Sequence, residues 1–224
     1  MKVIITGTTG MVGEGVLLTC LNNPAISEVL SVSRRSNGVK HPKLRECLVS
    51  DFSRLESIES QLRGYDACFY CAGVSSVGMT EEAYTQITYN TAVHFATTVQ
   101  RLNPGMVLTH ISGLHTDGTE KNKTMWARVK GRAENAMMRL PFRGVYNFRP
   151  GFMSPVPGQQ HVKKLFRVML VLTPLVRLLF PSQMLTLDEV GRAMINAVNK
   201  GYEKQVLEIA DIRALAARSG STKN

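Results

Sequence analysis

The stretch that decides the fold is TGTTGMVG, residues 6–13, which comes directly after an apolar run and directly before a helical pattern. Gly7 permits a tight turn, Gly10 lets the backbone approach a pyrophosphate, and Gly13 lets the helix pack closely against the strand. The N–H groups and the dipole at the start of the helix attract phosphates. The motif therefore indicates a dinucleotide site, and its candidate residues are Gly7, Thr9, Gly10, Met11, Val12 and Gly13.

The rest of the chain continues to alternate short β-rich runs with longer helical patterns. Such alternation predicts an α/β fold with a doubly wound parallel sheet, the Rossmann architecture, and helices on both faces. In one predicted helix, Ser53 and Glu56 have the spacing of a capping box. We expect strands over residues 2–6, 28–33, 45–49, 67–71, 106–111, 144–148 and 205–209, and helices over 11–22, 53–62, 80–102, 125–139, 188–199 and 212–217.

After the sixth strand the alternation ends in PGFMSPVPG, residues 150–158, whose three prolines predict a loop. Residues 163–180 are almost all apolar apart from Lys and Arg, and Pro174 is expected to divide them into two short helices. We therefore expect an NAD(P)-binding Rossmann domain over residues 1–155. Residues 156–224 are expected to form a small C-terminal helical substrate lobe that completes the same domain.

The composition and charge limit the classes of protein and partner. The chain has 224 residues, of which 44% are hydrophobic and 20% are charged, so disordered and fibrous proteins are excluded. The net charge is +10, and no carboxylate lies between Glu134 and Asp188, so an anion is an expected neighbour of this part. Segment 163–180 is expected either to pack on the core or a second subunit, or to contact an anionic membrane surface. No nucleic-acid partner is expected, because the chain has no recognition helix or aromatic-interleaved basic sheet.

The four cysteines do not indicate a disulfide framework. Cys68 and Cys71 form a CxxC pair inside an apolar run, where strand geometry directs the two sulfurs to opposite faces. A second pair or a nearby histidine is lacking, so we expect no metal site. The first residues, MKVIITG, enter the glycine turn without the apolar region and cleavage site of a signal peptide, which favours a cytoplasmic location.

The end of the second strand bears on which nucleotide is bound. An NAD site usually has an Asp or Glu there that holds the ribose hydroxyls, whereas this chain reads Ser33-Arg34-Arg35. The two guanidinium groups of Arg34 and Arg35 suit a 2′-phosphate, so NADP(H) is favoured over NAD(H). The alternative is a pair of solvated surface arginines.

Two further strand ends are candidate cofactor contacts. Asp51 and Phe52 follow the third strand, where a carboxylate and a backbone amide would meet the adenine edge. Cys71, Ala72 and Gly73 end the fourth strand, and the small Ala and Gly would let a cofactor lie against the main chain.

Together these residues resemble the short-chain dehydrogenase/reductase superfamily in its extended and atypical branches. The resemblance rests on the glycine motif, on Asp51-Phe52, on Cys71-Ala72-Gly73 and on Arg149-Pro150-Gly151. It covers about residues 1–155 and continues more weakly to residue 217. Within the superfamily the chain is similar to Tat-interacting-protein-type oxidoreductases and to bacterial NAD-dependent epimerases. The resemblance implies cofactor contacts by Pro150 and Gly151 as well.

The superfamily's catalytic set is an Asn, a Ser and a Tyr-x-x-x-Lys, and the resemblance assigns Asn90, Ser112 and Lys130 to three of its positions. In such enzymes the Lys holds the nicotinamide ribose and lowers the pKa of the Tyr, and the Ser hydrogen-bonds the substrate carbonyl. The Tyr position is Trp126, and no other Tyr in the chain has a Lys four residues later. An indole N–H donates a hydrogen bond but does not titrate near neutral pH, so the proton donor is unassigned. The candidates for it are His115, Lys121, Lys123 and Tyr89, of which His115 has the best intrinsic pKa.

Two functions follow as hypotheses. The first is an NADP(H)-binding oxidoreductase or epimerase-like enzyme that acts on a small carbonyl compound. The alternative is a non-catalytic NADP(H)-binding regulatory module that engages a protein or an anionic membrane. Trp126 favours the second hypothesis, and the retained Asn90, Ser112 and Lys130 favour the first. A homodimer through helices 80–102 and 125–139 is a further expectation.

Overall fold

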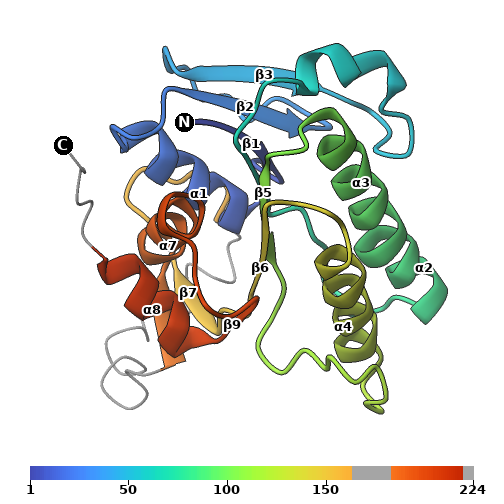
Figure 1. Cartoon of the computed structure of the whole chain (residues 1–224). Helices are drawn as coiled ribbons and strands as arrows, with labels where there is room; N and C mark the ends of the chain where they lie inside the picture. The colour runs from blue at the N-terminus through green and yellow to red at the C-terminus, as the bar shows by residue number, and fades with distance from the viewer. Residues whose placement is uncertain (163–182, 219–224) are drawn as a thin grey trace.

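The computed structural model describes residues 1–162 and 183–218, and within them a seven-stranded sheet forms the centre (Figure 1). The strand order is β3-β2-β1-β4-β5-β6-β9, and every neighbouring pair is parallel. The predicted doubly wound α/β fold is therefore confirmed. The strands are β1 (Lys2–Thr6), β2 (Glu28–Ser33), β3 (Leu44–Leu48), β4 (Ala67–Tyr70), β5 (Val107–Ile111), β6 (Gly144–Phe148) and β9 (Val206–Leu207).

Helices cover both faces of the sheet (Figure 1). One face carries α1 (Met11–Asn22), α7 (Leu187–Lys200) and α8 (Ile209–Ala217). The other face carries η1 (Glu56–Leu62), α2 (Glu81–Thr85), η2 (Gln86–Thr91), α3 (Ala92–Leu102) and α4 (Met125–Met138).

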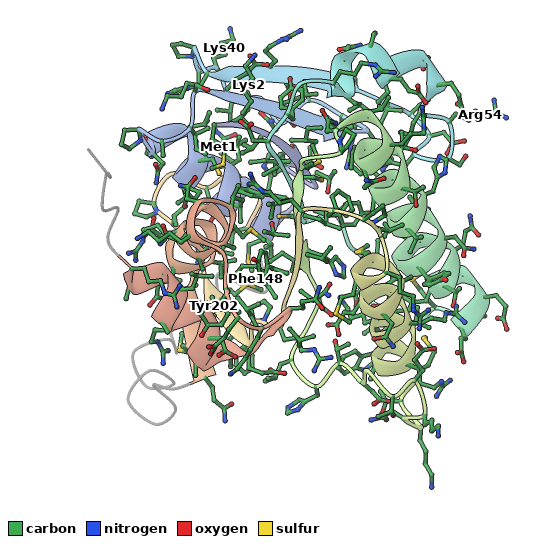
Figure 2. All side chains as sticks on the ribbon, in the orientation of Figure 1. Met1, Lys2, Lys40, Arg54, Phe148 and Tyr202 are labelled. Carbon is green, nitrogen blue, oxygen red and sulfur yellow. The ribbon has the colours of Figure 1, made fainter. Side chains whose placement is uncertain are left out.

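The core is divided by the sheet because side chains alternate along a strand. In β1, Val3 and Ile5 are buried with α1 and α7, whereas Ile4 is buried with α3. Figure 2 shows Phe148 of β6 and Tyr202 on the side of the sheet that carries α7 and α8. Both faces are apolar, which is why the strands read as continuous hydrophobic runs.

The predicted helix from Ser53 is wrong at its start. The amide and the hydroxyl of Ser53 both donate to Asp51 Oδ1, at 2.9 and 2.7 Å, so Ser53 closes a turn on the preceding carboxylate and does not cap a helix. The helical segment begins at Glu56 and is a 3₁₀ helix, η1. The capping box with Glu56 is therefore absent, because Asp51 takes the Ser53 hydrogen bonds.

The predicted helix over 80–102 has an irregular interior. Thr80 is its N-cap, and its hydroxyl accepts from the Ala83 amide at 3.3 Å. The middle six residues, η2, form a wider π turn between α2 and α3. There the Thr91 hydroxyl donates to the Gln86 carbonyl at 2.8 Å, which satisfies an acceptor inside the widened turn.

The predicted loop 150–158 contains a short strand. β7 (Phe152–Ser154) lies between two prolines and pairs in parallel with β8 (Met184–Thr186) in a separate two-stranded sheet. The last helix also begins earlier than predicted, at Ile209, because Glu208 and Asp211 form a capping box there.

The C-terminal residues belong partly to the main sheet. β9 pairs with β6 at its edge, and Gly191 of α7 packs so closely on Thr19 of α1 that an added Cβ would lie 2.7 Å from the threonine side chain. The domain boundary at residue 155 stays a prediction. The expectations for segment 163–180 and for Pro174 lie outside the described residues.

Candidate functional site

The candidate site lies at one edge of the sheet. Because neighbouring strands are parallel, their carboxyl ends meet there, which is where open α/β sheets bind ligands. The glycine turn follows β1 at this edge, Arg34 follows β2, Cys71 follows β4, Ser112 follows β5 and Arg149 follows β6. The fold thus brings together candidates that are far apart in the sequence.

The glycine turn has the close contacts that its three glycines predict. Gly7 has φ +73°, and a Cβ there would lie 2.7 Å from the Cys71 oxygen. A Cβ on Gly13 would lie 2.2 Å from the Gly7 oxygen, so only glycine lets α1 pack on the turn. Gly10 is exposed and its amide donates to Gly7 at 2.9 Å. The close contacts and the exposed backbone of the glycine turn fit the predicted pyrophosphate position.

The start of α1 is open toward the same edge. Gly10 is the N-cap and, within the described residues, no side chain accepts a hydrogen bond from the first turn of the helix. Thr9, Met11 and Val12 are half-buried around it. Backbone N–H groups at a helix N-terminus attract phosphate, so this geometry fits the roles predicted for these three residues.

Thr6 ties the glycine turn to the end of β4. Its hydroxyl accepts hydrogen bonds from the Cys71 and Ala72 amides, both at 3.1 Å. Gly73, the next residue, is exposed, and an added Cβ would meet nothing within 4 Å. The main chain is therefore open at Gly73, as predicted for a surface against which a cofactor lies.

The two arginines after β2 are exposed. Within the described residues the side chains of Arg34 and Arg35 have no ion pair with a carboxylate. The backbone beside them is held, because the Ser33 hydroxyl donates to the Arg35 carbonyl at 2.6 Å. Two guanidinium groups are thus free to meet an anion at the end of β2.

Asp51 and Phe52 differ in exposure: the Asp51 side chain is at the surface, whereas the Phe52 ring packs on the core. The Asp51 carboxylate is exposed, and the hydrogen bond from the Ser53 hydroxyl, followed by that from its amide, lowers the pKa of Asp51. The Phe52 ring packs 5.6 Å from the ring of Phe95 in α3. Phe52 therefore anchors the turn on the core, while the backbone amide and the Asp51 carboxylate remain at the surface.

Ser112 and Lys130 meet at the carboxyl end of β5. The Lys130 ammonium group donates to the Ser112 carbonyl oxygen at 3.1 Å. The Ser112 hydroxyl is buried and lies 3.1 Å from the Thr116 hydroxyl. A hydroxyl pair and an ammonium group thus lie together where the superfamily resemblance places the reacting carbonyl and the ribose.

Burial lowers the pKa of Lys130 to about 8, and the charge of Glu134 opposes that shift. Glu134 stabilises the charged form of Lys130 only in part, because its carboxylate is already paired with Arg149. That ion pair is bidentate, with Nε–Oε1 3.0 Å and Nη2–Oε2 2.5 Å. Glu134 is fully buried and Arg149 also reaches Glu208 at 3.1 Å. A neutral amine is therefore accessible to Lys130 near physiological pH.

Trp126 lies in the first turn of α4, four residues before Lys130, and is half-buried. The two residues are therefore one helical turn apart, and the assignment of Trp126 to the Tyr position of the superfamily stays a prediction. His115 is exposed and has φ 64°, a left-handed backbone conformation on the loop after β5. Lys121 and Lys123 are exposed, and Tyr89 lies under the guanidinium of Arg132 at 4.5 Å.

The structure does not bring Asn90 into hydrogen-bond contact with Ser112 or Lys130. Asn90 is exposed in η2, and its amide donates to Gln86 Oε1 at 2.7 Å. Its catalytic role stays a prediction.

Pro150 and Gly151 connect the site to the C-terminal part. The Pro150 carbonyl accepts from the Leu114 amide at 3.3 Å. A Cβ on Gly151 would lie 2.8 Å from the Gln183 oxygen, so the glycine lets β7 approach the start of β8. Gly151 thus has a packing role, beside its predicted cofactor contact.

Four residues that position the site were not predicted. Thr6 is one; its place directly before the first glycine was the available signal. Thr116 and Glu134 act through tertiary contacts to Ser112 and Arg149 that have no sequence signature. Glu14, fully buried in α1, accepts the Gln160 and His161 amides, each at 2.7 Å, and so holds residues 160–161 against the nucleotide helix.

The remaining expectations concern cysteines and metals. Cys68 packs with the α3 side of the core and Cys71 with the α1 side, which confirms the predicted opposite faces. Burial raises the pKa of both thiols. Among the residues described, no group of three or more His, Cys, Asp or Glu side chains is placed to hold a metal ion. No helix in the same residues is long and apolar enough to cross a membrane.

Comparison with known proteins decides the family. The model of the NAD dependent epimerase/dehydratase family matches residues 3–122, which include the glycine turn and Ser112. The chain belongs to this family. Its membership confirms the resemblance to the atypical short-chain dehydrogenase/reductase group and the expectation of an enzyme of the oxidoreductase or epimerase-like type that uses a nicotinamide cofactor.

Two fungal relatives are both called "Protein fmp52, mitochondrial". The protein from Aspergillus fumigatus is 28% identical over 160 residues, which are 68% of this chain and 67% of the relative. The protein from Emericella nidulans is 26% identical over 161 residues, with the same coverage.

Solved structures show the same fold at low identity. The Bordetella bronchiseptica enzyme WbmF in complex with NAD+ has a TM-score of 0.67 and 14% identity, over 96% of this chain and 76% of that one. MoeE5 in complex with UDP-glucose and NAD has a TM-score of 0.66 and 16% identity, over 97% and 81%. The Streptomyces venezuelae dTDP-glucose 4,6-dehydratase DesIV, with NAD bound, has a TM-score of 0.67 and 16% identity, over 96% and 79%.

Proposed function

We propose that this protein is an NADP(H)-dependent oxidoreductase or epimerase-like enzyme that acts on a small carbonyl compound. The observation that carries the proposal is the contact between the Lys130 ammonium group and the Ser112 carbonyl, at 3.1 Å, on the sheet edge that also holds the glycine turn. Ser112 and Lys130 are the proposed catalytic residues, with Trp126 in the place of the usual Tyr and Asn90 on the neighbouring helix.

The preference for NADP(H) rests on Arg34 and Arg35. Both side chains are exposed at the end of β2, where an NAD site would have a carboxylate. The solved neighbours named above are complexes with NAD+ or NAD, so the proposed preference rests on the residues of this chain alone. Forked guanidinium donors match the oxygens of a 2′-phosphate.

The roles of the chain's own residues follow from their contacts. A bound nicotinamide supplies or accepts a hydride. The Ser112 hydroxyl, paired with Thr116, donates a hydrogen bond to the substrate carbonyl oxygen. Lys130 would hold the ribose hydroxyls, and its lowered pKa of about 8 would let its amine take up or give up a proton near neutral pH. The Trp126 indole contributes shape and one N–H donor to the pocket.

A second function is favoured by Trp126 alone. Without a titratable phenol four residues before Lys130, the protein would bind NADP(H) as a regulatory module and engage a protein or an anionic membrane. The proposed membrane contact involves segment 163–180, outside the described residues. The homodimer and the cytoplasmic location likewise stay predictions.

Calorimetric titration with NADPH and then NADH tests the proposal. We expect NADPH to bind more tightly, and we expect the double variant Arg34→Ala/Arg35→Ala to lose most of that advantage while it keeps its affinity for NADH. A matched control is Arg63→Ala/Arg139→Ala, which removes two exposed arginines away from the end of β2. Binding of neither nucleotide would reject the enzymatic function, and equal binding of both would reject the NADP(H) preference.

A further inference from the structure

We propose that Asn37 and Glu46 are positioning residues for cofactor selectivity, which hold the Arg34-Arg35 turn in register with the glycine turn. The inference rests on the proposed NADP(H) preference and names the residues that would establish it. Neither residue is expected to touch the nucleotide.

Asn37 links the two turns of the nucleotide site. It is buried, with 3% of its surface exposed. Its side-chain nitrogen, Nδ2, donates to the hydroxyl of Thr8, inside the glycine turn, at 3.4 Å and to the hydroxyl of Ser31 in β2 at 3.3 Å. The two hydroxyls are themselves 2.7 Å apart. A closed polar cluster therefore joins the pyrophosphate turn to the strand that carries the arginines.

Glu46 holds the same turn from the other side. It lies in β3, opposite Ser31 of β2. One of its carboxylate oxygens accepts from the backbone N–H of Asn37 at 2.9 Å, and the other accepts from the Ser36 hydroxyl at 2.7 Å. Both acceptors of the carboxylate are thus used by the turn that follows the arginines.

The turn is tied on both sides of the arginine pair. The Ser33 hydroxyl holds the Arg35 carbonyl at 2.6 Å, and the Asn37 side-chain oxygen accepts from the Val39 amide at 2.8 Å. The arginine side chains between these points are exposed. A fixed backbone with free side chains is the arrangement expected when a loop is organised before its ligand arrives, because less ordering is then required on binding.

A carboxylate beside a site for a 2′-phosphate would be unfavourable if it acted by charge alone. The positioning role and the charge role therefore predict opposite results for Glu46. If Glu46 positions the turn, its removal weakens NADPH binding. If it only repels the phosphate, its removal strengthens NADPH binding, and if it holds ribose hydroxyls, its removal weakens NADH binding.

The test is calorimetric titration of the full chain with NADPH and with NADH. For Asn37→Ala and Glu46→Ala we expect the dissociation constant for NADPH to rise about tenfold, which corresponds to the loss of one or two hydrogen bonds. We expect the dissociation constant for NADH to change less than about twofold. Glu46→Gln keeps one acceptor and is expected to fall between Glu46→Ala and the unchanged protein. Glu59→Gln, which alters an exposed ion pair with Arg101, is the control and should change neither constant.

The ratio of the two constants separates positioning from a general loss of structure, which would weaken both nucleotides equally. The inference would be overturned if the variants left the ratio of the NADPH and NADH dissociation constants unchanged, or if they bound NADPH more tightly than the unchanged protein. Should Asn37→Ala fail to fold, the surface variants Glu46→Ala and Glu46→Gln decide the question. If the unchanged protein shows no preference for NADPH, the proposed function fails and this inference with it; if it prefers NADPH and the variants keep that preference, only the inference fails.

Discussion

The ammonium group of Lys130 lies 3.1 Å from the carbonyl oxygen of Ser112, so α4 and the end of β5 meet through a charged hydrogen bond in the candidate site. The Lys130 side chain comes from a helix, and the carbonyl belongs to the residue directly after a strand. Burial lowers the pKa of Lys130, so its protonation near neutral pH differs from that of a lysine in water.

Lys130 is expected to react as a neutral amine at lower pH than an ordinary lysine. Its pKa is lowered to about 8 by burial, against about 10.4 for a free lysine side chain. Pulse acetylation with a trace reagent, followed by mass spectrometry across pH 6–11, gives the midpoint for each lysine. A midpoint near 8 for Lys130 is the expected result, and a midpoint near 10 would contradict the enclosed geometry.

Trp126→Tyr is expected to create or raise reductase turnover. The substitution places a phenol four residues before Lys130, where the lysine's charge lowers the pKa of the phenol and makes it a proton donor. NADPH oxidation is measured with quinones, aldehydes and ketones. Trp126→Phe is the matched control, since it has a ring of the same size without the hydroxyl. Equal rates in the two variants would argue against an otherwise intact site.

Gly13→Ala is expected to abolish tight nucleotide binding. Its Cβ would lie 2.2 Å from the Gly7 oxygen, so the turn or the helix must move. We expect a loss of about 1–3 kcal/mol in the free energy of unfolding, as for other overpacked sites. Gly105→Ala is the control, because a Cβ there meets nothing within 4 Å. Urea denaturation and NADPH titration measure the two effects. If Gly13→Ala bound NADPH as tightly as the unchanged protein, the glycine turn would not be the pyrophosphate site.

His110 is expected to make the fold sensitive to acid. Its pKa is lowered to about 4, first by burial and then by the charge of Lys130, while the hydrogen bond with Asn147 and the charge of Glu134 oppose the shift. Between pH 6.5 and pH 4 the unfolded chain therefore binds a proton that the folded chain does not. Stability is expected to fall over this interval as the pH decreases, by about 3 kcal/mol if the full shift applies.

Urea denaturation at pH 7 and pH 5 measures this change for His110. His110→Gln keeps a hydrogen-bonding side chain beside Asn147 and removes the titration, so its stability should depend less on pH over the interval. The exposed His94→Gln is the control. An identical pH dependence in all three proteins would mean that His110 does not titrate as expected.

Much of the fold could be predicted because it depends on local pattern. The strand β1 and the helix α1 have the predicted bounds, since a continuous apolar run followed by glycines and a helical period leaves little choice of conformation. The parallel pairing of the strands followed from the alternation of strands and helices, because parallel strands require crossover helices. The error at Ser53 shows the limit: a hydroxyl has several local acceptors, and Asp51 was nearer than the next turn of helix.

The sequence by itself determined the architecture of this protein, its family and the type of nucleotide site, because glycines and periodic apolar residues act through the backbone next to them. Only the tertiary structure decided that Thr6 holds Cys71, that Asn37 reaches Thr8, and that Glu134 neutralises Arg149 while Lys130 stays enclosed. These contacts join residues that belong to different elements. Their energies depend on distance and burial, which no spacing along the chain encodes, and so the charge state of the site emerged with the fold.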